Sequence, residues 1–293
     1  MKKTGKGRIW WWILLVLILV GLLGYFFRTE IGHHNAEKPP VSEERSDAQK
    51  AETPLEGKPG LGGEEAPLEQ SKVQGAITQN LAPEELCKKT QQEMADFFIY
   101  LDGKRYFKEL APRQGSRERF KEILREMAAH PPIPAGEGSA PESIAETVFH
   151  FFRILNRSDL RLIREVMSHE DDALEIDLEM FHRWVTLGDH CPDPHHLRPS
   201  LDVLYQYAGF FLNTIGGRAY LFRRSPGLRL LVSYYCLLIL HEADKKGRNN
   251  YGIDVRALIP PLRKEMSYYP NFQFRDEYVR HLDEIEGEYS QRR

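Results

Sequence analysis

The uncharged segment from Ile9 to Phe27 constrains the chain more than any other feature, because every residue in it is aliphatic, aromatic or Gly. As a helix it would extend about 28 Å, which is close to the hydrocarbon thickness of a bilayer. A soluble core helix is rarely apolar on every face over this length. Three successive Trp residues at one end and Tyr25 at the other are typical of membrane interfaces. We therefore predict a transmembrane helix over residues 9–27.

A cleaved signal peptide has a similar outline and is the alternative interpretation. Its apolar region usually spans about 7–15 residues and is followed by small residues at the cleavage site. Here the apolar run is longer, and it ends in bulky aromatic residues and Arg28. No Cys follows it directly, so a lipid-modified N-terminus is also disfavoured. These features favour an uncleaved anchor.

The charges beside this segment predict its orientation. Four basic residues and no acidic residue precede it (Lys2, Lys3, Lys6 and Arg8). Because positive flanks stay in the cytoplasm, we expect residues 1–8 to be cytoplasmic and the rest to lie outside, in the periplasm if the source is bacterial. The apolar stretch from Leu228 is too short for a second span and contains Arg229, which indicates a buried core helix.

Residues 28–82 differ from both neighbours in composition. They are rich in Glu, Pro, Gly, Ser and Gln, and from Thr29 to Ala82 five Lys or Arg stand against ten Asp or Glu. Such a segment cannot bury enough apolar area to offset its ordering entropy, so we predict a disordered linker. Its mean reach is about 40 Å. It either spaces the domain from the membrane or serves only as a solvated connection.

Residues 83–293 read as one soluble domain with helical periodicity almost throughout. The pattern predicts an all-α fold, a bundle or irregular array of about eight helices. A Pro-rich stretch near residues 130–141 is a possible sub-boundary. The domain is nearly neutral, which gives no indication of a nucleic-acid partner. The expected helices cover residues 82–101, 116–130, 142–155, 158–167, 171–188, 200–217, 226–245 and 274–289.

The three Cys residues leave one unpaired if any pair forms. Cys236 lies among apolar residues and is expected to be buried. Cys87 and Cys191 are in polar surroundings and could form a disulfide, which outside the cytoplasm can persist. The alternative is three free thiols, with Cys87 packed on its helix face.

The segment "GDHCPDPHH" from Gly188 is the densest polar cluster. His and Cys side chains bind zinc, and neighbouring Asp residues can orient imidazoles. The spacing matches no standard zinc motif, so chance clustering of His in a Pro-containing loop is the alternative. No other cofactor is indicated. The candidate ligands are His190, Cys191, His195 and His196.

Arg218, Arg223 and Arg224 form the candidate anion site. No carboxylate occurs from Val203 to His241, and the last two Arg residues precede the expected helix that starts after Ser225. A helix N-terminus with adjacent guanidinium groups suits an anion. The simpler interpretation is that these Arg residues pair with acidic residues of other helices or stay solvated.

The aromatic residues near the C-terminus are candidates for a peptide or glycan groove. Sealing of the last helix onto the core is the more common role of such residues. The members of this group are Tyr268, Tyr269, Phe272 and Phe274.

No catalytic motif identifies a reaction, because the chain has no G-x-S-x-G, S-x-x-K, H-E-x-x-H or phosphate-binding Gly loop. We expect a membrane-anchored envelope protein whose outer domain binds a partner protein, as a scaffold or adaptor. One alternative is an enzyme acting on cell-wall polymer, with Glu175, Asp177 or Glu242 as acid and base. Another is a metal-binding module centred on residues 189–196.

Overall fold

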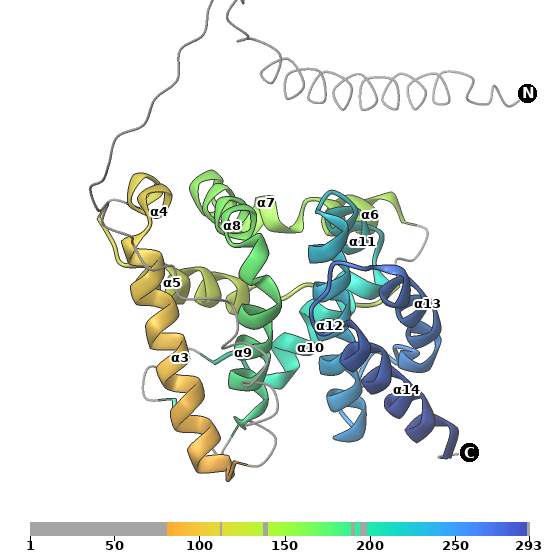
Figure 1. Cartoon of the computed structure of the whole chain (residues 1–293). Helices are drawn as coiled ribbons and strands as arrows, with labels where there is room; N and C mark the ends of the chain where they lie inside the picture. The colour runs from red at the N-terminus through yellow and green to blue at the C-terminus, as the bar shows by residue number, and fades with distance from the viewer. Residues whose placement is uncertain (1–80, 112, 137–139, 189–190, 194–197, 292–293) are drawn as a thin grey trace, which may run out of the picture. The chain divides into compact units, whose positions relative to one another are not determined.

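The computed structural model describes residues 81–111, 113–136, 140–188, 191–193 and 198–291. Within them the chain has only helices and no strand, so the all-α prediction is confirmed (Figure 1). The described residues all belong to one compact unit. The predicted anchor over residues 9–27, the cytoplasmic segment and nearly all of the linker lie outside the described residues.

The first half of the described chain has one 3-10 and seven α-helices. They are α3 (Pro83–Gly103), α4 (Arg105–Leu110), α5 (Ser116–Ala129), α6 (Pro141–Val148), α7 (His150–Ile154), α8 (Arg157–His169), η1 (Asp171–Ala173) and α9 (Leu174–Thr186). The second half adds α10 (Leu201–Asn213), α11 (Ile215–Phe222), α12 (Pro226–Lys245), α13 (Val255–Tyr268) and α14 (Arg275–Gln291).

Helix α12 is the centre of the largest apolar cluster. Leu237, Leu240 and Ala243 are fully buried, and α10, α13 and α14 contribute the side chains around them. The expectation that this apolar segment is a core helix is therefore confirmed. Among the described helices, none is both long enough and apolar enough to cross a membrane.

Helix α10 connects this cluster to a second one. Tyr205 and Ala208 face the α12 cluster, whereas Tyr207 and Phe210 face a cluster formed with α4, α5, α7 and α8. A third cluster joins α3 to α9 through Phe98 and other apolar side chains. Every face of α10 is thus in contact with another element, which explains why its sequence is apolar nearly all round.

The structure has more α-helices than the eight expected, because two expected helices each divide in two, and α4 and α13 lie where no helix was expected. The expected helix over residues 142–155 divides at Phe149, and that over 200–217 divides at Thr214. Helix α13 contains Pro260 and Pro261, which normally interrupt a helix. Both prolines are exposed, while the opposite face buries Ile259 and other apolar residues.

The Pro-rich stretch near residues 130–141 packs against α10 where it is described. Pro134 is fully buried, its carbonyl accepts a hydrogen bond of 3.0 Å from the Asn213 amide, and a Cβ on Gly209 would lie 2.4 Å from the Pro134 ring. This part of the stretch is therefore fixed to the core, although it contains the residues that suggested a sub-boundary.

Two successive glycines allow α11 to fit between α6 and α10. A Cβ on Gly217 would lie 1.9 Å from the carbonyl oxygen of Phe210, and one on Gly216 would lie 2.3 Å from the Thr147 carbonyl. Thr214 begins the helix, since its buried hydroxyl accepts a hydrogen bond of 3.0 Å from the Gly217 N–H. The glycines therefore start a helix here, whereas the sequence pattern had indicated a helix end.

Gly217→Ala is expected to destabilise the domain by on the order of 3 kcal/mol, because the added methyl group meets backbone that cannot rotate away. Gly287→Ala is the matched control. Gly287 is a helical glycine of α14 with open space around it, so alanine is expected to stabilise by up to about 1 kcal/mol. Urea unfolding followed by circular dichroism measures both changes. Equal effects of the two substitutions would contradict this packing.

Candidate functional site

Four exposed apolar side chains on neighbouring segments form what we call the α11 surface: Phe149 and Phe152, at α7, and Ile215 and Phe222, on α11. Phe152 is 66% exposed and Phe222 is 71% exposed. Ile215 and Phe222 are seven residues apart and so share one face of α11. Exposed apolar side chains on adjoining segments make this region a candidate binding surface.

The side chains beneath the α11 surface fix its orientation. Phe151 is buried, and its ring centre lies 4.7 Å from that of Tyr220 and 5.6 Å from that of Phe210. His150 and Phe151 are the buried residues of α7, whereas Phe152, the next residue, is exposed. Phe149 is the N-cap residue before the helix and is also exposed.

The candidate anion residues lie beside this surface on α11 and the turn that follows it. The Arg218 Nε donates a hydrogen bond of 2.9 Å to the Leu212 carbonyl, and the Arg224 guanidinium lies 4.3 Å from the Tyr220 ring centre. The α12 N-terminus already has its cap, since the Ser225 hydroxyl accepts from the Leu228 N–H at 3.3 Å. Arg223 is exposed and forms no ion pair with another described residue. The three side chains thus make a basic edge, and a common anion pocket stays a prediction.

A second exposed region, which we call the α9 face, has the opposite charge. It contains Asp96 and Ile99 on α3, Asp171 in η1, and Ile176 and Asp177 on α9. Residues 170–179 include six carboxylates and no basic residue. Asp171 and Asp177 form no ion pair with another described residue, although the Lys104 ammonium lies nearby over the Tyr100 ring.

Glu170 joins the two parts of the α9 face through buried hydrogen bonds. Its side chain is almost fully buried, and it accepts from the Tyr100 hydroxyl at 2.8 Å and from the Tyr106 hydroxyl at 2.6 Å. Burial, with the charge of Glu170 as a smaller cause, raises the pKa of Asp177 to about 7. Burial and the bond to Glu170 also raise the pKa of Tyr106. The Asp177 carboxyl is therefore partly protonated near neutral pH.

The structure separates the three carboxylates that sequence reasoning grouped as candidate acids and bases. Glu175 accepts hydrogen bonds from the backbone N–H groups of Gln273 and Phe274, at 2.7 and 3.2 Å, and so fixes the segment before α14. Glu242 pairs with Lys246 at 2.9 Å. Only Asp177 combines a raised pKa with the absence of a hydrogen bond or ion pair to another described residue.

Cys87 and Cys191 are joined by a disulfide, with Cα atoms 5.2 Å apart, and both residues are buried. The bond connects the start of α3 to the loop after α9. Arg198 holds the same loop by donating hydrogen bonds to the Gly188 carbonyl at 2.6 Å and to the Cys191 carbonyl at 2.8 Å. Cys236 is free and buried, and burial raises the pKa of its thiol to about 12.

The disulfide bears directly on the candidate metal site. A sulfur in a disulfide cannot act as a thiolate ligand, so in this form Cys191 does not complete a zinc site. His190, His195 and His196 lie outside the described residues. Elsewhere in the described parts of the chain, no group of three or more His, Cys, Asp or Glu side chains could hold a metal ion. The zinc site stays a prediction.

The aromatic residues near the C-terminus are mostly part of the core. Phe272 is buried, its ring centre lies 4.5 Å from that of Tyr269, and Phe274 packs on the same cluster. The Tyr269 hydroxyl would lie 2.9 Å from a Cβ on Gly227, so Tyr269 covers the start of α12. Tyr268 is 77% exposed and points away from the cluster. Tyr269, Phe272 and Phe274 therefore seal the core, whereas Tyr268 does not.

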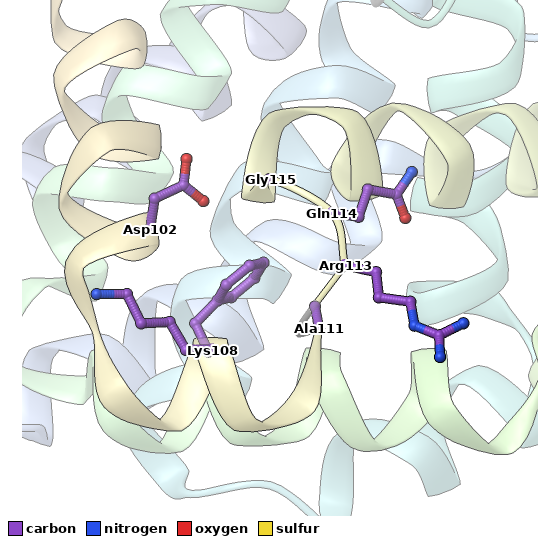
Figure 2. Close-up of a pocket in the computed structure, with 7 residues that line it drawn as sticks. Asp102, Lys108, Ala111, Arg113, Gln114 and Gly115 are labelled. Carbon is purple, nitrogen blue, oxygen red and sulfur yellow. The ribbon is translucent and has the colours of Figure 1, made fainter.

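A hollow of about 530 Å³ lies between the end of α3, α4 and the start of α5 (Figure 2). Lys108 and Arg113 give it positive charge, and Asp102 is its acidic group. The Asp102 carboxylate accepts a hydrogen bond of 2.7 Å from the Ser116 N–H and thereby caps α5. The hollow therefore contains no second carboxylate that could act with Asp102 as an acid–base pair.

Sequence reasoning identified none of the four residues of the α11 surface. The signal that could have found two of them is the aromatic run "FHFF" from Phe149, because one short helix does not bury every member of such a run. No protein-family model, curated protein or solved structure matches the chain.

Peptide mapping without reduction is expected to recover Cys87 and Cys191 in one linked peptide. The bond closes a loop across a sequence separation of 104, for which chain entropy gives roughly 4–5 kcal/mol of stabilisation. Urea unfolding of the double Ser variant measures that loss, and Cys236→Ser controls for a change of thiol. Recovery of both cysteines as freely alkylated peptides would reject the pair.

Asp177→Asn is expected to stabilise the domain above pH 7 and to have no effect near pH 4. Burial raises the folded-state pKa of Asp177 from 3.8 to about 7, so the wild type loses stability as the pH rises through this range, whereas the Asn variant does not. The difference above pH 7 is on the order of 2 kcal/mol. Unfolding by urea across this range, with exposed Asp171→Asn as control, measures it. A difference independent of pH would contradict the assignment.

Proposed function

We propose that the chain is a single-pass, membrane-anchored envelope protein whose helical domain lies outside the cytoplasm and binds a partner protein, as a scaffold or adaptor. The observation that carries the proposal is the α11 surface. Its two most exposed rings, Phe152 and Phe222, are costly to leave in water, because a fully buried Phe gains about 1.5–3 kcal/mol from burial. A partner that covers both rings recovers this free energy.

The charge beside the α11 surface defines the chemistry of the partner. Arg218 and Arg223 are exposed at its edge, and no carboxylate occurs between Val203 and His241. A complementary segment therefore presents apolar side chains flanked by carboxylates. Basic or uncharged apolar segments fit less well, because they leave the guanidinium groups without a partner.

The predicted anchor and linker suit a docking role. A positive N-terminal flank followed by the apolar run at residues 9–27 supports attachment to the membrane with the domain outside. The acidic linker over residues 28–82 allows the domain to search a distance of about 40 Å or more from the anchor. Attachment of this kind raises the local concentration of the domain, so a surface of modest affinity is sufficient for binding.

The alternative function is an enzyme that acts on wall polymer. Of the candidate carboxylates, only Asp177 supports it, because its raised pKa suits a proton donor. An enzyme acting on a polymer also needs a cleft that holds the substrate beside the acid. Neither Glu170 nor Asp177 lines the hollow near Asp102. Partner binding is therefore the better-supported function.

Phe152→Asp and Phe222→Asp, each in the full chain, are expected to reduce crosslinked capture of the partner from intact membranes by on the order of 10-fold or more. Each substitution places an unpaired carboxylate in the contact. Because both rings are exposed, the fold is expected to be retained, and circular dichroism checks this. Tyr268→Asp is the matched control, since it changes an equally exposed aromatic residue away from the α11 surface.

Two results would contradict the proposal. Capture that is unchanged by both Phe substitutions would remove the α11 surface from the contact. Loss of the chain from membranes on carbonate washing, with a new N-terminus near Thr29, would identify the apolar run as a cleaved signal peptide.

A further inference from the structure

We propose that the partner at the α11 surface is a second copy of this chain, which presents its α9 face, so that the domains associate head to tail. This inference rests on the proposed function, because it names the occupant of the same surface. Two observations support it: the α11 surface and the α9 face both expose apolar side chains, and the charged residues beside them have opposite signs.

The α9 face has the chemistry that the α11 surface requires. Ile99 is 70% exposed and Ile176 is also exposed, so the face offers apolar contacts, while the Lys104 ammonium lies 3.8 Å from the Tyr100 ring centre. Asp96 and Asp171 are exposed beside them. The α11 surface requires apolar side chains flanked by carboxylates, and the α9 face supplies both.

Hydrogen bonds hold the acidic and apolar groups of the α9 face in one arrangement. Tyr100 on α3 donates to Glu170 at 2.8 Å, and Glu170 directly precedes Asp171. Asp96, Ile99 and Tyr100 lie at spacings of three and four residues and therefore share one face of α3. A preformed surface loses less conformational entropy on binding than a mobile one.

The two regions are on different elements of the domain. Figure 1 shows α3 and α9 on one side of α10, α6 and α11 on the other, and α7 between α8 and α6. Because the regions lie apart within one domain, each is available to a neighbouring copy. Contact between two different surfaces is heterologous, so an open chain of copies has a free α11 surface at one end and a free α9 face at the other. The expected product is an open chain or a ring of domains, each tethered by its own linker.

Sedimentation of the full chain in detergent, at low and high ionic strength, is the first part of the test. We expect association that depends on concentration and weakens with salt, because exposed ion pairs are screened. In the basic-edge variant, Arg218→Glu and Arg223→Glu are combined. In the acidic-face variant, Asp96→Lys and Asp171→Lys are combined. Each variant alone is expected to raise the apparent Kd by on the order of 100-fold.

Mixing the two variants is the decisive part of the test. The acidic-face variant retains a native α11 surface, and the basic-edge variant retains a native α9 face, so one native contact is restored. We expect the mixture to associate with the wild-type Kd within about threefold. Circular dichroism of each variant alone confirms that the fold is retained.

The remaining results overturn the inference. A monomeric wild-type chain rejects self-association, and so does association that neither variant weakens. Failure of the mixture to associate rejects the pairing of these two surfaces. Binding of the wild type only to vesicles with anionic lipid would assign the α11 surface to the membrane. If self-association fails while Phe152→Asp still abolishes capture of another envelope protein, the proposed function stands and only the identity of the partner is wrong.

Discussion

The close approach of α11 to α10 and α6 at Gly216 and Gly217 is the contact on which the rest of this account depends. With no side chain at either position, the backbone of α11 rests directly on the Phe210 and Thr147 carbonyl groups. The helix therefore lies close against the domain, and Ile215 and Phe222 on one of its faces are exposed, with the Arg229 guanidinium 5.3 Å from the Phe222 ring centre. The basic residues of the region lie along the edge of that face.

The opposite part of the domain is held by polar and covalent contacts. The disulfide joins α3 to the loop after α9, and the Glu170 carboxylate binds two tyrosine hydroxyls from α3 and α4. A buried carboxylate is stable only when its lone pairs are satisfied, as they are here. The acidic groups of η1 and α9 are therefore held near one another, at the expense of a raised pKa at Asp177. The acidic residues of this part of the domain and the basic residues beside α11 are therefore on different elements.

Periodicity predicts the helical class because it is a local property, and the apolar segment of α12 is correctly interpreted as core. The sites depend on contacts between segments far apart in the sequence. Gly216 and Gly217 are typical of a helix end, yet they begin α11, because the constraint comes from Phe210 and Thr147. Pro260 and Pro261 argue against α13, but burial of its other face outweighs their cost. The pairing of Cys87 with Cys191 could be suggested from polarity, although only the fold brings their Cα atoms together.

The central claim is that the α11 surface is covered by another protein when the chain is in its membrane. Hydrogen exchange of the full chain in native membranes, compared with the chain purified in detergent at low concentration, tests it most directly. We expect slower exchange in membranes for His150–Ile154 and Ile215–Phe222, with unchanged exchange in α13. Equal exchange of α7 and α11 in the two samples would contradict it.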